Sequence, residues 1–329
     1  MPSLINVTPD PTIIQLGPLV IGWYALGYLA GLAVMFAVTM RELERRGIER
    51  QHLWNAGLLV AIFAIVGGRL YHVIHEWDLI YAADPIRAIL PIAADGRIGF
   101  AGLGLYGGII GALVGLIVYG LWARVPIRLG VDAVIPGTLF AQAIARWGNF
   151  FNQELYGPPT DAPWGIAIEC HNRVAQYPCA QFPFETTGFH PLFFYESALT
   201  LTGGLIALWL SRRYLGAGLR AGDLTAFWAI WYGGTRFVLE TFRDGWNWTL
   251  GGIATAQLVS LIVIAIGIAL IAWNHRPGRP PDPVPVDVGR GDHGPPSIDE
   301  PLPSIDEPTQ VADEPAHTEE AGGEPGPPA

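Results

Sequence analysis

Long apolar runs separated by short polar segments dominate the first 273 residues of the chain. A helix needs about 20 apolar residues to cross a bilayer, and three runs without formal charge reach that length: Leu19–Met40, Ile98–Ala123 and Gly252–Trp273. Four further runs are apolar but include a few polar or charged residues: Leu53–Ile74, Val131–Phe150, Pro191–Leu210 and Leu224–Leu239. The pattern predicts an all-α, polytopic membrane protein with seven transmembrane helices.

The placement of arginines predicts the orientation, because short cytoplasmic loops carry an excess of positive charge. The segments after the first, third, fifth and seventh predicted spans lie on one side of the membrane. They hold eleven arginines: Arg41, Arg45, Arg46, Arg50, Arg124, Arg128, Arg212, Arg213, Arg220, Arg276 and Arg279. The loops on the opposite side hold only Arg87, Arg97, Arg173 and Arg243. We therefore expect the N-terminus outside the cell and the C-terminus in the cytoplasm.

Two segments differ in composition from the spans. Residues 147–190 are rich in Pro, Gly, Asn and aromatics, and they are expected to form a small external cap on the membrane domain of residues 1–276. Cys170 and Cys179 both lie there, and the sequence permits either a disulfide or two free thiols. Residues 277–329 are rich in Pro, Gly and acidic residues, which predicts a disordered cytoplasmic tail.

Composition excludes several classes of protein. Only 15% of the residues are charged, against about a quarter in a typical soluble domain. All 19 basic residues are arginine, and the net charge of −10 comes from the tail, which holds 2 arginines and 12 acidic residues. A basic surface for nucleic acid is therefore absent. Two cysteines are too few for a zinc ribbon, and no His-Cys-carboxylate spacing predicts a metal site, so we expect neither metal nor cofactor.

Ionisable residues at membrane depth are costly and need a reason. Arg69, Arg146 and Arg236 each come late in a span that runs outwards. Polar residues come early in spans that run inwards: Tyr24, Tyr106, Tyr195 and Glu196. Further polar residues flank the same ends: Asn149, Asn152, Glu154, His190 and Glu240. Together they predict a polar belt near the outer leaflet.

Structural and functional interpretations of this belt both remain open. Arg236 and Glu240 are four residues apart, so they share a helix face and can form a structural ion pair. Tyr24 and Tyr195, taken singly, are typical of interfacial aromatics. Three arginines at one depth, however, suit a phosphate such as a lipid headgroup. The glycines of residues 102–111 lack the Lys-Ser/Thr of a phosphate loop, and they favour close helix packing.

Five ordered motifs carry a resemblance to a known family. The most specific is Ala145-Arg-Trp-Gly-Asn-Phe-Phe-Asn-Gln-Glu-Leu-Tyr-Gly157. The others are Trp23-Tyr-Ala-Leu-Gly-Tyr28, Gly67-Gly-Arg-Leu-Tyr71, His190-Pro-x-x-x-Tyr-Glu196 and Arg236-Phe-Val-Leu-Glu-Thr-Phe-Arg243. The chain resembles the prolipoprotein diacylglyceryl transferases over residues 15–270, and the tail has no part in the resemblance.

The resemblance implies an enzyme of the bacterial cytoplasmic membrane whose site faces the outer leaflet. It implies transfer of the sn-1,2-diacylglyceryl group of phosphatidylglycerol to the lipobox cysteine of a preprolipoprotein signal peptide, which begins lipoprotein maturation. Catalytic roles are implied for Tyr106, Arg146, Arg236 and Glu240. Substrate-binding roles are implied for Tyr24, Arg69, Asn149, Asn152, Glu154, Gly157, His190, Tyr195 and Glu196.

Two positions depart from the family pattern. Tyr106 stands where many members place a histidine proposed as the base, and tyrosine, with a pKa of about 10, is a poor base at neutral pH. We therefore expect Tyr106 to orient the substrate through its hydroxyl, while a carboxylate or the arginine field assists thiol ionisation. Ala145 replaces a usual glycine, which we expect to alter only helix packing.

Two other classes of function remain as alternatives. A transporter also uses broken polar helices, but it needs polar residues along a path through both halves of the membrane, and the inner halves of these spans are almost purely apolar. A membrane scaffold would bind partners through the acidic tail. Another kind of phosphatidyl transferase is disfavoured because no Asp-Gly-x-x-Ala-Arg segment with following aspartates occurs.

Overall fold

A computed structural model of the chain describes residues 5–7, 9–16, 19–82, 85, 88, 104–243 and 249–280. Within these residues the regular secondary structure is helical apart from three two-stranded antiparallel sheets. The helices are α1 (Trp23–Glu44), α2 (Gln51–His75), α4 (Leu105–Trp122), α5 (Ile127–Ala145), α6 (Trp147–Phe151), α7 (Leu192–Tyr214), α8 (Asp223–Glu240) and α9 (Thr255–Asn274), with a π-helical turn at Trp77–Tyr81 and a 3-10 turn at Cys170–Asn172. The strands are β1 (Thr12–Leu16) with β2 (Leu19–Gly22), β3 (Pro159–Thr160) with β4 (Gly188–Phe189), and β5 (Thr249–Leu250) with β6 (Ile253–Ala254).

Each of the seven predicted spans overlaps at least one of these helices, and residues 98–103 of the third predicted span lie outside the described residues. Five are long and apolar enough to cross a membrane, namely α1, α2, α5 continued by α6, α7 and α9. The apolar part of α4 is shorter, and α8 is not among the five. The protein is thus all-helical and polytopic, whereas the number of seven spans and the orientation of the termini stay predictions.

Two predicted spans begin too early. The first includes Leu19–Gly22, which form β2, and the last includes Ile253–Ala254, which form β6. The apolar run before α1 is rich in β-branched residues, which favour strands, and an apolar run alone does not distinguish a short strand from a helical turn. The helices themselves start at Trp23 and Thr255.

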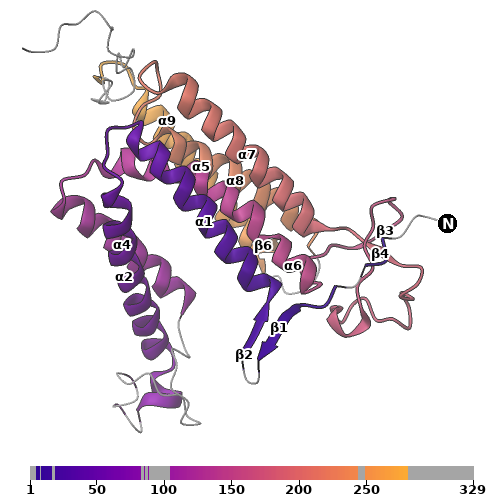
Figure 1. Cartoon of the computed structure of the whole chain (residues 1–329). Helices are drawn as coiled ribbons and strands as arrows, with labels where there is room; N and C mark the ends of the chain where they lie inside the picture. The colour runs from indigo at the N-terminus through magenta and orange to yellow at the C-terminus, as the bar shows by residue number, and fades with distance from the viewer. Residues whose placement is uncertain are drawn as a thin grey trace, which may run out of the picture. The chain divides into compact units, whose positions relative to one another are not determined.

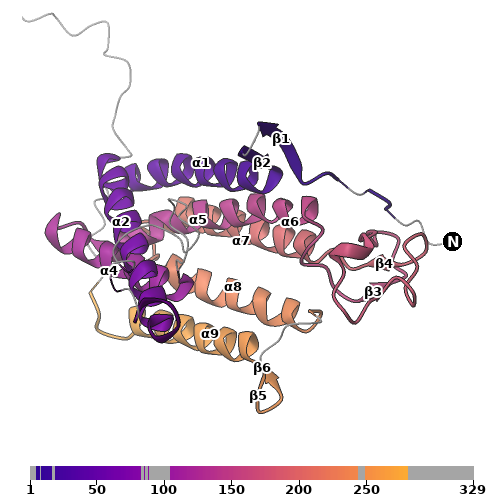
Figure 2. The ribbon, with the colours of Figure 1, turned by 90° about the horizontal axis from the view of Figure 1, so that it is seen from below.

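The helices α1, α5, α7, α8 and α9 lie side by side in one bundle (Figure 1). The central helix is α5, which packs against α1 and α7, while α8 packs against α9. Figure 2, in which the helices run across the picture, shows the beginnings of α1 and α7 at the same end as α6 and the end of α8. We call this the α6 end. The helices α2 and α4 pack on one another and form a separate pair.

Close helix contacts depend on glycine. A Cβ atom at Gly31 of α1 would lie 2.9 Å from the carbonyl oxygen of Ala141 in α5, so the two backbones touch. In the α2–α4 pair, Gly107 contacts Gly67, and Gly111 contacts the backbone of α2. Small residues allow such approach in membranes, where packing rather than hydrophobicity holds helices together. The packing role predicted for the glycines of residues 102–111 is confirmed at these two positions.

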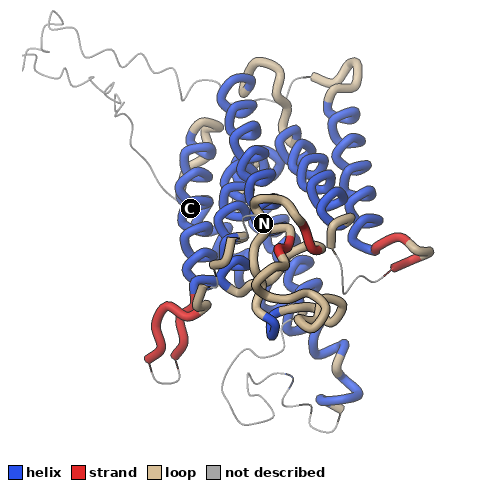
Figure 3. Tube along the Cα trace, turned by 90° about the vertical axis from the view of Figure 1, so that its right-hand side faces the viewer, coloured by secondary structure: helices blue, strands red, loops and turns tan. Residues whose placement is uncertain are grey.

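The segment between α6 and α7 is folded and lies at the α6 end, where Figure 3 shows its strands and loops. Phe189 is fully buried and packs with Tyr156 and Ile168 in a small apolar core. Burial raises the pKa of the Tyr156 phenol, although the backbone N–H of Val174, which donates to it, acts in the opposite direction. A disulfide between Cys170 and Cys179 cross-links the same segment. Its position outside the membrane stays a prediction, and residues 281–329 of the expected tail lie outside the described part of the chain.

The opposite end of the bundle holds buried polar groups. Arg46 follows α1, as predicted, but it is fully buried and donates to Glu42 Oε2 at 2.7 Å and Ser211 Oγ at 2.9 Å. Asp132 of α5 is 1% exposed and accepts three hydrogen bonds from the start of α8: Gly222 N at 2.7 Å, Thr225 N at 2.9 Å and Thr225 Oγ1 at 2.6 Å. Asp132 is thus a buried polar exception within the predicted span Val131–Phe150, whereas Arg46 lies in the loop predicted after the first span.

Asp132→Ala is expected to lower the free energy of unfolding by at least about 1–3 kcal/mol, because it leaves the donors of Gly222 and Thr225 at the start of α8 without their acceptor. The measurement is the apparent melting temperature of the purified protein in detergent. Asp161→Ala, which removes an exposed carboxylate from the segment after α6, is the matched control. An equal melting temperature for the two variants would show that the three hydrogen bonds do not stabilise α8.

Candidate functional site

An arginine held by a buried carboxylate lies at the α6 end of the bundle. Arg146 directly follows α5, and its Nη2 donates to Glu196 Oε1 in the second turn of α7 at 2.6 Å. The Glu196 side chain is 6% exposed, whereas that of Arg146 is 26% exposed. Ser197 Oγ donates to Ala143 O at 2.8 Å and ties the same turns of α7 and α5 together. The guanidinium is therefore fixed on one side and open on the other.

Amide side chains extend this cluster. Arg146 Nη1 contacts Asn149 Oδ1 at 3.4 Å, and Asn149 Nδ2 donates to Glu154 Oε1 at 2.7 Å. Asn152 Nδ2 lies 3.4 Å from the same carboxylate oxygen. Asn149 is buried, so its amide is held in one orientation. Glu154, by contrast, is exposed and binds these amides rather than an arginine.

A strained turn brings Glu154 back to α6. Gln153 and Leu155, on either side of Glu154, both have positive φ, at 53° and 55°. Non-glycine residues adopt this region at a cost, which persists only where the surroundings impose it. Gln153 is buried and its Oε1 accepts the backbone N–H of Glu169 at 2.7 Å, so the following segment holds the turn in place.

A second ion pair lies at the end of α8. Arg236 Nη2 lies 2.8 Å from Glu240 Oε2, and Arg243 Nη1 lies 3.9 Å from the same oxygen. The Glu240 side chain is 2% exposed, whereas that of Arg236 is 24% exposed. One buried carboxylate thus lies beside two guanidinium groups, and the ion pair expected between Arg236 and Glu240 is present.

Arg243 connects the two clusters electrostatically. Burial lowers the pKa of its guanidinium, the positive charge of Arg236 lowers it further, and the charge of Glu240 raises it. The charges of Glu196 and Arg146 also act on Arg243. The ion pairs of α5–α7 and of α8 therefore share one electrostatic field.

Tyr24, in the first turn of α1, lies beside α6. A Cβ atom at Gly148 would lie 2.6 Å from a ring carbon of Tyr24, so only glycine fits at that position. The hydroxyls of Tyr24 and Tyr28 are 3.2 Å apart.

His190 and Tyr195 form a polar pair at the start of α7. His190 Nδ1 and Tyr195 Oη are 3.0 Å apart, and Trp164 Nε1 donates to the same hydroxyl at 2.7 Å. Gly157 N–H donates to His190 O at 2.8 Å. A Cβ atom at Gly157 would lie 3.1 Å from both His190 Cβ and Phe242 O, which shows how closely the chain passes there.

Arg69 and Tyr106 lie on the α2–α4 pair. Arg69 Nε donates to Ala88 O at 3.2 Å, and its guanidinium lies over the ring of Tyr81. Tyr106 is 67% exposed, with its ring 6.0 Å from that of Tyr71. The remaining eleven candidates lie on α1, α5 to α8 and the segment between α6 and α7, as predicted from their positions along the spans. The structure thus gathers eleven of the thirteen at the α6 end.

Three contributors were missed by the sequence analysis. Arg243 was counted as a loop arginine and as the end of the last motif, but it was given no role in the site, although it follows Glu240 by only three residues. Tyr28 was named only as the end of the first motif, and Trp164 was not selected. Their hydrogen bonds to Tyr24 and Tyr195 depend on tertiary contacts that no local pattern reveals.

The arrangement suits an anionic ligand. Arg146 and Arg236 each have a buried carboxylate on one side and a side chain about one quarter exposed. A guanidinium carries five N–H donors in a planar fork that matches phosphate oxygens. Because the carboxylates orient these arginines, the site can bind a phosphate without first rearranging.

Comparison with known proteins agrees with this chemistry. The family model described as prolipoprotein diacylglyceryl transferase matches residues 11–273. The chain is 37% identical over 273 residues to the phosphatidylglycerol–prolipoprotein diacylglyceryl transferase of Chloroflexus aggregans, covering 79% of this chain and 87% of that protein. The enzymes of the same name from Synechococcus elongatus and Paenarthrobacter aurescens are 34% and 35% identical, each over 82% of this chain and over 89% and 83% of their own lengths. The chain belongs to the prolipoprotein diacylglyceryl transferase family.

Proposed function

We propose that the protein transfers the sn-1,2-diacylglyceryl group of phosphatidylglycerol to the thiol of the lipobox cysteine in a preprolipoprotein. The thiolate sulfur attacks the glyceryl carbon that bears the phosphate and forms a thioether. The bond from this carbon to the phosphate oxygen breaks, and glycerol phosphate leaves with the bonding electrons. The single observation that supports this proposal most is that the side chains of Arg146 and Arg236 are each about one quarter exposed and each oriented by a buried carboxylate.

Each part of the cluster has a role in this reaction. Arg146 and Arg236 bind the phosphate and stabilise the negative charge that it gains as it leaves. Asn149 fixes the headgroup, and Tyr24 lines the pocket. Glu196 and Glu240 orient the two arginines. Nearby arginines also favour the thiolate over the thiol, because positive charge lowers the pKa of a cysteine.

The proposed topology follows from the same residues. Seven spans with the N-terminus outside place the α6 end, and with it Arg146 and Arg236, towards the outer leaflet. There the enzyme meets phosphatidylglycerol from the bilayer and a signal peptide whose cysteine lies near the membrane surface. Cysteine accessibility labelling of Ala162→Cys, in the segment after α6, tests this. Modification by an impermeant reagent added outside the cell supports the orientation, and modification only from the cytoplasmic side contradicts it.

Transfer activity is tested with membranes that contain the protein, labelled phosphatidylglycerol and a lipobox peptide. We expect label on the peptide, and none on a peptide whose lipobox cysteine is replaced by serine. A folded protein that labels neither peptide overturns the proposed transfer activity. The site would then be interpreted as a lipid-binding or transport site. Deletion of residues 277–329 tests the scaffold alternative, which predicts that transfer is lost with the tail.

Tyr106→Phe is expected to lower kcat/KM by about 10-fold, because the variant loses only a hydroxyl hydrogen bond to substrate, worth about 1 kcal/mol or slightly more. The measurement is the transfer rate at several concentrations of phosphatidylglycerol. Tyr71→Phe, on the neighbouring ring, is the control. Full activity of Tyr106→Phe would remove this hydroxyl from the mechanism.

A further inference from the structure

One side-chain amide in α5 has no partner within the described part of the chain. Gln142 Oε1 is buried and accepts no hydrogen bond from any described residue. Nε2 of the same amide donates to no described residue either, but this atom is not buried, and the residue is partly exposed. Buried polar atoms are nearly always paired in native structures, so each exception needs an explanation.

Gln142 lies one helical turn before Arg146. Residues four apart share a helix face, and the backbone N–H of Arg146 donates to Gln142 O at 3.1 Å. A rise of 1.5 Å per residue separates the two positions by about 6 Å along the helix axis. The amide is therefore the next polar side chain along α5 from a guanidinium that the proposed function assigns to the lipid phosphate.

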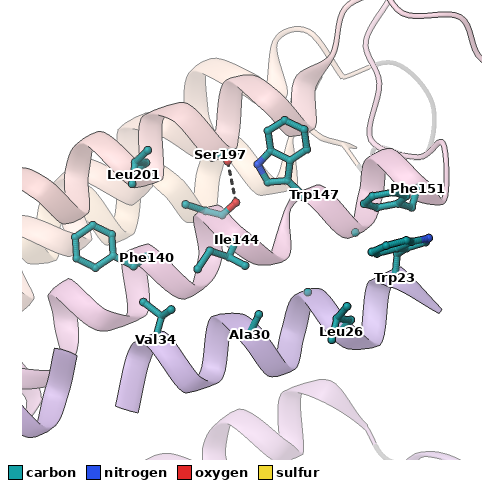
Figure 4. Close-up of a pocket in the computed structure, with 13 residues that line it drawn as sticks. Trp23, Leu26, Ala30, Val34, Phe140, Ile144, Trp147, Phe151, Ser197 and Leu201 are labelled. Carbon is teal, nitrogen blue, oxygen red and sulfur yellow. Dashed lines mark hydrogen bonds between the residues drawn. The ribbon is translucent and has the colours of Figure 1, made fainter. Parts of the chain in front are cut away.

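The face of α5 that carries Gln142 is not the face that contacts α1. Figure 4 shows Phe140 and Ile144 of α5 lining a groove against α1. At about 100° per residue, Gln142 lies about 160° around the helix from both of them. Leu139, on the same side as Gln142, belongs to a buried cluster with Leu224 of α8. Gln142 therefore starts from the side of α5 that faces the rest of the bundle, as the arginine does.

The open nitrogen makes this amide a donor towards a ligand. A side-chain amide has one acceptor oxygen and two N–H donors. Turning the amide by 180° would bury two unpaired donors in place of one unpaired acceptor, and each unpaired buried group costs free energy. The orientation with the oxygen inside is therefore favoured. A ligand that binds the open side of Gln142 must supply an acceptor.

Phosphatidylglycerol has such an acceptor at a matching distance from its phosphate. On the acyl side of the phosphate the lipid has no hydrogen-bond donor, and its strongest acceptors are the two ester carbonyls. Five covalent bonds join the phosphorus to the nearer carbonyl carbon, a span of about 6 Å when extended, at about 1.5 Å per bond. This span equals the separation of Arg146 and Gln142 along α5.

We propose that Gln142 Nε2 donates to an ester carbonyl of the donor lipid, and that this contact selects diacyl over dialkyl glycerophospholipids. The proposal rests on the proposed function, because the lipid phosphate must lie at Arg146. The nearer ester is on the glyceryl carbon next to the one that the thiolate attacks, so the contact also positions the reacting carbon. Gln142 binds substrate in this scheme and takes no part in bond making or proton transfer.

A donor lipid without carbonyls tests the proposal. Transfer is measured with diacyl phosphatidylglycerol and with its dialkyl ether analogue of equal chain length. The reaction breaks no acyl ester, so the chemical step is the same for both donors. For the wild type we expect kcat/KM to be about 10-fold higher with the ester, because the ether leaves the amide unpaired. Gln142→Met, which keeps the side-chain length but has no N–H, is expected to show no preference.

Thr39→Val is the matched control. Thr39 Oγ1 is likewise buried without a partner in the residues that the structure describes, but it lies near the other end of α1. This variant is expected to keep the wild-type ester preference. Gln142→Met is expected to melt no lower than the wild type, because it removes an unpaired buried acceptor. Gln142→Leu is the second variant if Gln142→Met fails to fold.

The outcomes separate the two proposals. A folded wild type that transfers nothing from either donor contradicts the proposed function. A wild type that transfers but uses both donors equally overturns the ester contact alone. An ester preference that the folded Gln142 variants retain overturns it as well. A lower melting temperature together with an equal loss of activity on both donors would assign Gln142 a structural role, and this too would overturn the proposal.

Discussion

Replacement of Arg146 by alanine is expected to lower the rate of diacylglyceryl transfer by at least about 100-fold, the usual effect of removing one preorganised group that stabilises developing negative charge. Arg146 is held by Glu196 at 2.6 Å and contacts Asn149, so its guanidinium is already positioned when the lipid arrives. The measurement is kcat/KM with labelled phosphatidylglycerol. Arg146→Lys, which keeps the charge but loses the planar fork, is expected to recover only part of the activity.

Loss of Arg146 also leaves Glu196 buried without its partner, which costs about 3–5 kcal/mol of stability in comparable pairs. The double variant Arg146→Ala/Glu196→Gln removes this unpaired charge, and we expect it to fold yet remain inactive. Arg213→Ala is the matched control, because Arg213 lies at the opposite end of the bundle, over the ring of Tyr214. Substantial transfer by the folded double variant would exclude Arg146 from the reaction.

Glu240→Gln is expected to lower kcat/KM on the order of 30- to 100-fold. The amide keeps the size of the side chain but removes the charge that holds Arg236 at 2.8 Å and faces Arg243 at 3.9 Å. The two guanidiniums then repel each other without a carboxylate between them, and Arg236 loses its orientation. We expect KM for phosphatidylglycerol to rise as kcat falls.

Glu44→Gln is the control for this variant. Glu44 also pairs with an arginine, Arg50, but at an exposed position beyond the other end of the bundle. Equal kcat/KM for folded Glu240→Gln and Glu44→Gln would show that the pair at the end of α8 has only a structural role. A melting temperature for each variant separates loss of folding from loss of activity.

The helical part of the fold is predictable from sequence because apolar length is a strong signal in membranes. The strands before α1 and α9 were missed because Leu19–Gly22 and Ile253–Ala254 are as apolar as the helices that follow them. The burial of Arg46 and Asp132 was also missed. It depends on Ser211 and Thr225 from distant segments, which the local sequence does not place.

For the site, depth along each span was the useful quantity. It brought Arg146, Glu196 and Glu240 to one end because neighbouring spans alternate in direction. Depth alone did not show which of these residues form ion pairs with one another. That Glu196 holds Arg146, and that Glu154 binds the amides of Asn149 and Asn152, follows from helix rotation and from the turn after α6. Depth also grouped Tyr106 and Arg69 with the others, although they lie on the α2–α4 pair.

The most direct test of the proposed function is the mass of both products made by the purified protein from phosphatidylglycerol and a lipobox peptide. We predict a peptide whose cysteine carries a diacylglyceryl group through a thioether stable to hydroxylamine, together with an equal amount of glycerol phosphate. An unmodified peptide, or an acyl group on sulfur that hydroxylamine removes, would contradict diacylglyceryl transfer by this protein.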